Sequence, residues 1–201
     1  MRLLRVSFLA LGLFLVSCAP GTVQPIKGSM AEHRGSLIVA DHPLKDEVRE
    51  VLEQLLRAAG QPARSVTLYI VRGEEGIGVA NCALRELNLS EGLLNMARDK
   101  MQPAARRTMF ANLLGHELGH ILKGNCGTHP DNELEADRLA IEWSRKAGYG
   151  CSWLRNLRQA NAEKKPDLSR RFLSTWAIHP ELNARAYEQA VRLCPLPPAR
   201  K

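Results

Sequence analysis

Two histidines stand four residues apart in the stretch NLLGHELGHILKG, residues 112–124, and a glutamate directly follows the first of them. On a helix, His116 and His120 share one face and can direct ring nitrogens at one point. Glu117 is rotated away by about 100°, beside a bound metal ion, where its carboxylate can accept a proton from water on the ion. The H-E-x-x-H pattern therefore predicts a metal site. Two solvated histidines on a surface helix are the alternative.

A catalytic zinc site needs a third protein ligand. The acidic stretch NELEADRLA, which begins at Asn132, supplies candidates. Glu133 and Asp137 are four residues apart and share a helix face, whereas Glu135 points elsewhere. We assign Glu133 to the metal, and we expect Asp137 to accept the other ring N–H of a ligating histidine and so fix its tautomer. His129, in the preceding loop, is the rival ligand. Acidic residues in the first turn of a helix are also favourable without any metal.

The elements that must position these residues follow from hydrophobic periodicity. Apolar residues recur at helical spacing in six segments: 44–59, 103–123, 131–147, 152–161, 167–176 and 180–193. The β-branched and aromatic run at 65–71 predicts a strand, and residues 82–90 alternate imperfectly, as in an edge strand with one wet face. The order of helix, strands and helices predicts an α+β domain with a small sheet.

The first 17 residues have the layout of a secretory signal peptide, with two arginines before an apolar run and no acidic residue. The run is too short to span a bilayer comfortably. The segment LVSC, residues 15–18, resembles the lipobox of bacterial lipoproteins, in which the cysteine, here Cys18, is lipidated. Alanine at position 19 favours the outer membrane facing the periplasm, by similarity to lipoproteins of Gram-negative bacteria. A plain signal peptide with a chance cysteine is the alternative.

About 184 of the 201 residues remain once the signal is removed, enough for one domain with a substantial core. Residues 18–35 are interpreted as a lipidated N-terminus and tether, 36–195 as the domain and 196–201 as a tail. The formal net charge is +7, with the basic residues scattered along the chain. That distribution suits an anionic membrane surface and predicts no nucleic-acid partner.

Besides Cys18, the chain has four cysteines: Cys82, Cys126, Cys151 and Cys194. In an exported chain, four cysteines suggest two disulfides, with three possible pairings. A straight helix between Cys126 and Cys151 would hold them roughly 25 Å apart, which argues against that pair. We favour Cys82 with Cys126 and Cys151 with Cys194. Four free thiols are the alternative.

Three ordered motifs make the sequence resemble the M48 peptidases, the gluzincin family that includes bacterial membrane-associated quality-control proteases and eukaryotic CAAX-processing enzymes. The family pattern is H-E-x-x-H, then E-x-x-A-D, then His-Pro followed by arginine. The matching segments are HELGH at 116–120, ELEAD at 133–137 and HPELNAR at 179–185. The stretch GVANCALRELNLSEGLL is similar to the family's edge strand and its lead into the active-site helix. The resemblance covers about residues 45–190.

The resemblance implies a zincin-like fold with a small, mostly antiparallel sheet, an active-site helix and further helices. It implies one zinc ion per chain, with Glu117 as the general base. His179 and Arg185 would help to hold an oxyanion or the substrate carbonyl. Without the resemblance, His179 would be taken as a residue at a helix start. Only twelve residues separate His120 from Glu133, fewer than in most members, which affects the cleft wall and substrate preference.

The activity implied is that of a zinc-dependent endopeptidase of the cell envelope, acting on unfolded or misassembled polypeptides. An extended substrate would add to an exposed edge strand, made of Ala83, Leu84, Arg85, Glu86, Leu87 and Asn88. The alternative is a metal-binding, chaperone-like lipoprotein whose site is plugged by His179. A third interpretation, similarity of the ELEAD segment to the cytosolic ImmA-like metallopeptidases, conflicts with the export signal.

Overall fold

The computed structural model of the 201-residue chain describes residues 38–39, 41–72, 78–126, 129–163 and 180–195. Several predictions from the sequence fall elsewhere in the chain. The signal peptide, Cys18 with its tether, the helix at 167–176, His179 and the tail all lie outside the described residues. Within the described part, no helix combines the length and the apolar character needed to cross a membrane.

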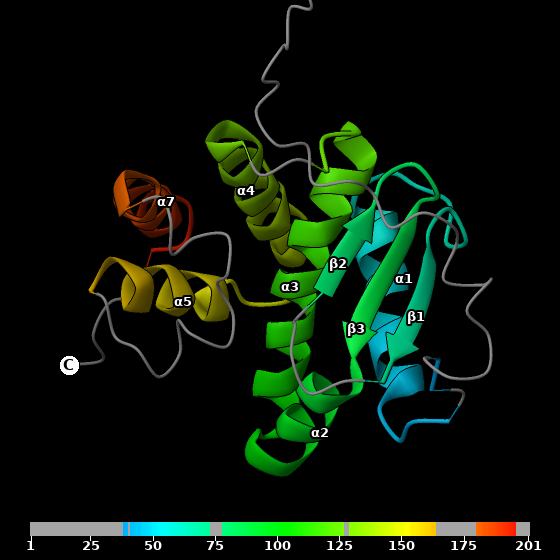
Figure 1. Cartoon of the computed structure of the whole chain (residues 1–201). Coiled ribbons are helices and arrows are strands. Elements are labelled where there is room, and N and C mark those ends of the chain that lie inside the picture. Colours follow the sequence, from blue (N-terminus) through cyan, green and yellow to red (C-terminus); the bar gives the residue numbers. More distant parts are fainter. Residues whose placement is uncertain (1–37, 40, 73–77, 127–128, 164–179, 196–201) are drawn as a thin grey trace, which may run out of the picture.

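The described residues form a mostly helical α+β fold, as predicted (Figure 1). The helices are α1 (Lys45–Ala58), α2 (Glu91–Lys100), α3 (Pro103–Lys123), α4 (Pro130–Lys146), α5 (Ser152–Ala162) and α7 (Pro180–Leu193). The strands are β1 (Thr67–Val71), β2 (Gly78–Asn81) and β3 (Glu86–Ser90), which form one sheet in the order β1-β3-β2.

The central strand of this sheet is β3, which corrects two predictions. It pairs parallel with β1 and antiparallel with β2, so the sheet is mixed rather than mostly antiparallel. All five residues of β3 are buried, and residues 82–85 form the turn that precedes it, so the prediction of an exposed edge strand over 83–88 is wrong. The polar residues that alternate along β3, Glu86, Asn88 and Ser90, are buried, so β3 has no wet face. Within the described residues, β1 and β2 form the two edges of the sheet instead.

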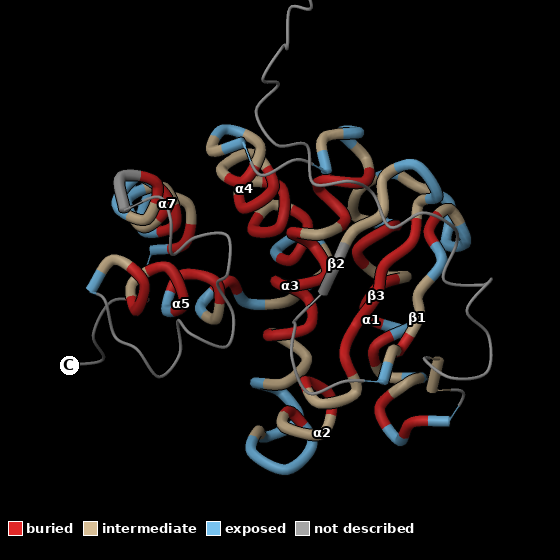
Figure 2. Tube along the Cα trace, viewed as in Figure 1, coloured by how far each residue is buried: buried red, intermediate tan, exposed pale blue. Residues whose placement is uncertain are grey.

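Helix α3 lies at the centre of the fold, between the sheet with α1 on one side and α4, α5 and α7 on the other (Figure 1). Proline at its first turn suits a helix start, and Gly124 ends it in the left-handed conformation, with φ of 66°. Phe110, Leu114 and Leu118 are fully buried in the main core, which joins α3 to α1 and the sheet. Figure 2 shows β3 and much of α3 in red, the colour of buried residues. The histidine-bearing turns are thus part of a rigid element.

Two disulfides connect segments that are distant in sequence, and they confirm the favoured pairing. Cys82–Cys126 joins the turn before β3 to the segment that follows α3. Cys151–Cys194 joins the start of α5 to the residue after α7, inside a second apolar cluster. Covalent links of this kind restrict the unfolded chain and stabilise the folded one.

Candidate metal centre

The helices α3 and α4 carry the predicted ligands, and they pack closely because small residues face each other. A Cβ atom added at Gly115 would lie 3.0 Å from the Cα of Ala140, and one added at Gly119 would lie 3.0 Å from the Cα of Ala136. An alanine at either of these two positions of α3 would therefore require α4 to give way by a few tenths of an ångström. Glu133 lies about one turn before Ala136, so the close approach brings its carboxylate to the histidines.

Gly119→Ala is expected to weaken metal binding by moving α4 away from α3. The new Cβ would meet backbone atoms of Ala136, so the helix has to shift, and Glu133 shifts with it. Overpacking costs about 1–3 kcal/mol. Alanine's better helix propensity offsets about 1 kcal/mol of that. Metal affinity and thermal unfolding would be measured beside Gly150→Ala, whose Cβ meets nothing nearer than 3.6 Å. Unchanged metal affinity in Gly119→Ala would contradict the role of this close approach.

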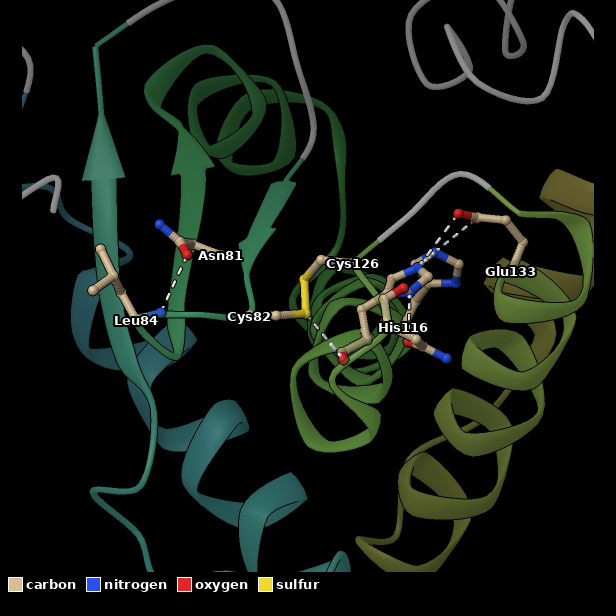
Figure 3. The surroundings of a disulfide bond; sticks show 8 residues. Asn81, Cys82, Leu84, His116, Cys126 and Glu133 are labelled. Atoms are coloured by element: carbon tan, nitrogen blue, oxygen red, sulfur yellow. Dashed lines mark hydrogen bonds and ion pairs between the residues drawn. A yellow bond between two sulfur atoms is a disulfide. The ribbon is translucent and has the colours of Figure 1, made fainter. Parts of the chain in front are cut away.

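His116, His120 and Glu133 form a buried group that could hold a metal ion. The two Nε2 atoms are 3.2 Å apart. The Nε2 atom of His116 lies 3.3 Å from Oε2 of Glu133, and that of His120 lies 3.5 Å from Oε1 of the same carboxylate. Donor groups of three residues on two helices therefore converge, as the H-E-x-x-H and ELEAD spacings predicted. Figure 3 shows Glu133 directed at the histidines from α4.

Each histidine is oriented by an oxygen that contacts its other ring nitrogen. Nδ1 of His116 donates to Oδ1 of Asp137 at 2.8 Å, the contact predicted for Asp137. Nδ1 of His120 lies 3.2 Å from Oδ1 of Asn125 and 3.3 Å from its backbone oxygen. Because the Nδ1 atoms are donors, the Nε2 atoms face the shared point with free lone pairs when both rings are neutral. Asn125 was not identified from the sequence.

The charges in the site are strongly coupled. Burial lowers the pKa of His116, but its hydrogen bonds to Asp137 and Glu133 outweigh burial and raise the pKa to about 10. Burial raises the pKa of Glu133, yet its bond to His116 produces a net decrease. Burial and the charge of His116 lower the pKa of His120. With these pKa shifts, His116 is protonated and Glu133 ionised near neutral pH, and a bound cation would displace the proton from His116.

Glu117 is not among the three converging donors, and its carboxylate contacts the backbone of β2. It is half-buried, and its carboxylate accepts a hydrogen bond from the backbone N–H of Ala80 in β2. Burial raises its pKa to about 7, against the opposing effects of the His116 charge and the Ala80 N–H. A carboxylate with this pKa can both accept and release a proton near neutral pH. The position of Ala80 shows that β2 runs past the site.

A buried arginine from α5 completes the surroundings of Asp137. Arg158 donates from Nε to Oδ2 and from Nη2 to Oδ1 of Asp137, both at 2.6 Å. Burial raises the pKa of Asp137, but the charge of Arg158 and the bond from His116 lower it to about 2. Arg158 was not identified from the sequence, because it belongs to no motif and its contact depends on how α5 packs.

Two other predicted residues are exposed and make their contacts with Asp131. His129 is exposed and caps the start of α4, where its ring accepts from the N–H of Asp131. Arg185 is exposed on α7, and its Nη2 pairs with Oδ1 of Asp131 at 3.1 Å. The described contact of Arg185 is therefore with Asp131, two residues before Glu133, and not with the three donors.

No model of a known protein family matches the chain, and no curated protein matches it. The site has to be judged on its own geometry: two imidazoles and one carboxylate, all buried, each histidine held by an oxygen behind it. Such a group is suited to a divalent cation.

Proposed function

We propose that the protein is a zinc-dependent endopeptidase of the cell envelope that hydrolyses peptide bonds in unfolded or misassembled proteins. The observation that carries the proposal is the close approach of the two Nε2 atoms, 3.2 Å apart, to one carboxylate: Oε2 of Glu133 lies 3.3 Å from His116 and Oε1 lies 3.5 Å from His120. Donors at 2.0–2.1 Å from a tetrahedral zinc ion stand about 3.3 Å from one another. Three protein ligands leave one corner open, which distinguishes a catalytic zinc site from a structural one.

The chemistry divides between the ion and the side chains. A zinc ion held here would polarise the substrate carbonyl and lower the pKa of water. Glu117 lies next to the ligand His116 in the chain and is held by the N–H of Ala80. It is the group that can take a proton from the attacking water and pass it to the leaving amine.

The substrate class is argued from the edge strand β2. Its Ala80 N–H faces Glu117, so a polypeptide that adds to this edge would run past the general base. Strand addition uses backbone hydrogen bonds, which favour extended chains over folded ones. The substrate would bind along β2 and not along residues 83–88, because both hydrogen-bonding edges of β3 are already paired with neighbouring strands.

Membership of the M48 peptidases belongs to the same proposal and is supported by the ordered HELGH and ELEAD motifs, which meet at one point. Lipidation at Cys18 and a location at the outer membrane facing the periplasm rest on the N-terminal sequence. Two disulfides suit an oxidising compartment of that kind. The proposed partners are a polypeptide substrate and, through the anchor, a membrane.

Glu117→Gln is expected to abolish hydrolysis while leaving the metal in place. The purified protein would be incubated with zinc and casein, and the fragments would be read by mass spectrometry. General-base catalysis contributes about 10²–10⁴-fold, so the variant should lose at least that factor. Its zinc content should equal that of the parent, because Glu117 is not among the three converging donors.

Glu135→Gln is the matched control, because Glu135 is half-buried on α4 and pairs with Arg138. It should cleave casein like the parent. Equal fragments from the parent and Glu117→Gln would show that the cleavage comes from elsewhere. No fragments from either, with zinc bound, would exclude casein hydrolysis and favour the metal-binding, chaperone-like alternative.

A further inference from the structure

Arg158 and Asp137 form a buried ion pair directly behind the metal centre. Their side chains are 3% and 1% exposed. Two nitrogens of the guanidinium each donate a hydrogen bond of 2.6 Å to one of the carboxylate oxygens. Oδ1 of Asp137 accepts a hydrogen bond from Nη2 of Arg158 and another from Nδ1 of His116. The contacts therefore form one unbroken chain from α5, through α4, to a donor residue on α3.

The fork of Arg158 fixes the plane of the Asp137 carboxylate. A carboxylate held at one point can rotate about its χ angles, whereas a bidentate arginine sets both oxygens at once. Oδ1 is thereby kept in line with Nδ1 of His116. That contact determines which ring nitrogen carries the proton and where Nε2 points. The orientation of His116 thus depends on a residue outside both ligand-bearing helices.

A second buried arginine on α5, Arg155, serves as a control for Arg158. Arg155 lies about one turn before Arg158, and its Nη1 donates to the backbone oxygen of Cys194 at 3.4 Å. Like Arg158, it is buried. Its contact leads to the end of α7 rather than to Asp137. The two arginines therefore form a matched pair on one helix.

We infer that Arg158 is a positioning residue of the metal centre, acting through Asp137 to hold His116 in its ligating orientation. This assigns α5 to the site, although α5 lies outside the HELGH and ELEAD motifs. The inference rests on the metal centre of the proposed function, but it does not require hydrolysis. Its test therefore measures metal binding. A failure of the positioning role of Arg158 can then be distinguished from a failure of the proposed peptidase activity.

Arg158→Met is expected to lower the affinity for zinc by about 10–100-fold, the usual effect of losing a residue that supports a ligand. Affinity would be measured on the purified protein by competition with a chromophoric chelator. Binding of Co²⁺ would be followed by its visible absorption, which reports ligand geometry and should differ from that of the parent. Arg155→Met should change folding stability while leaving zinc affinity and the Co²⁺ spectrum close to those of the parent.

Two further variants protect the test against misfolding. Arg158→Lys keeps the buried charge but cannot grip both oxygens, so it should also lose zinc affinity. Arg158→Met combined with Asp137→Asn removes both charges. This double variant should bind zinc about as well as Asp137→Asn alone, because both changes interrupt the same series of hydrogen bonds to His116. Parent-like zinc affinity in Arg158→Met or Arg158→Lys would overturn the inference. Additive losses in the double variant would overturn it as well. Intact zinc binding without casein cleavage would count only against the proposed function.

Discussion

Zinc is expected to raise the melting temperature of the protein by about 5–10 °C, and Glu133→Ala is expected to abolish that rise. A ligand that binds only the folded state at 100 times its dissociation constant stabilises by about 2.7 kcal/mol. In a chain of this size, each kcal/mol corresponds to about 2–4 °C. The three donors are buried and already converge, so the folded state should bind zinc far more strongly than the unfolded chain.

Glu133 supplies the third donor, and its removal leaves two imidazoles 3.2 Å apart without a carboxylate to complete the group. The negative charge that balances a divalent cation is lost with it. Glu135→Ala on the same helix is the control, because Glu135 pairs with Arg138 and Lys123 instead. Melting would be followed by circular dichroism with zinc and with a chelator. An equal zinc-induced rise in Glu133→Ala and the parent would exclude this group as the zinc site.

Sequence reasoning succeeded where the relevant distances are set within one helix. The spacing of His116 and His120 fixes their common direction, and the spacing of Glu133 and Asp137 does the same one helix later. For the disulfides, the length of the intervening helix excluded the pairing of Cys126 with Cys151, and the choice between the two remaining pairings was a preference. These arguments use only local geometry, and that geometry is found in the structure.

Sequence reasoning failed where position depends on partners distant in sequence. The alternation in β3 suggested a wet face, but Glu86 and Asn88 are buried, so β3, the central strand of the sheet, has no face open to solvent. The contact of Arg158 with Asp137 depends on the packing of α5, which no periodicity reveals. Gly115 and Gly119 did carry a readable signal. Glycine costs about 1 kcal/mol relative to alanine inside a helix, so two glycines four residues apart indicate a close approach.

The two disulfides are expected to contribute equally to stability but unequally to metal binding. Their sequence separations are 44 and 43 residues. In the chain-entropy model, loops of that length give about 4 kcal/mol each. That is a large fraction of the about 5–15 kcal/mol that stabilises a typical domain. Replacing either pair by serines should therefore lower the free energy of unfolding by a similar amount, measured by urea denaturation.

Only Cys82–Cys126 lies against a candidate ligand (Figure 3). Sγ of Cys82 is 3.2 Å from the backbone oxygen of His120. Cys126 follows Asn125, whose side chain contacts Nδ1 of His120. Loss of this disulfide frees the segment that orients His120, so zinc affinity should fall by about 10–100-fold. The other disulfide holds α5 to α7 and does not contact His120.

The comparison separates a local effect from a global one. Zinc affinity would be measured by chelator competition at low temperature, where both double-serine variants remain folded. If affinity simply followed stability, two disulfides with nearly equal loops would weaken zinc binding equally when removed. A loss confined to Cys82→Ser/Cys126→Ser would instead show that this disulfide acts through the position of Asn125 and His120. Equal losses in both variants would contradict that local role and leave the disulfide as a stabilising crosslink alone.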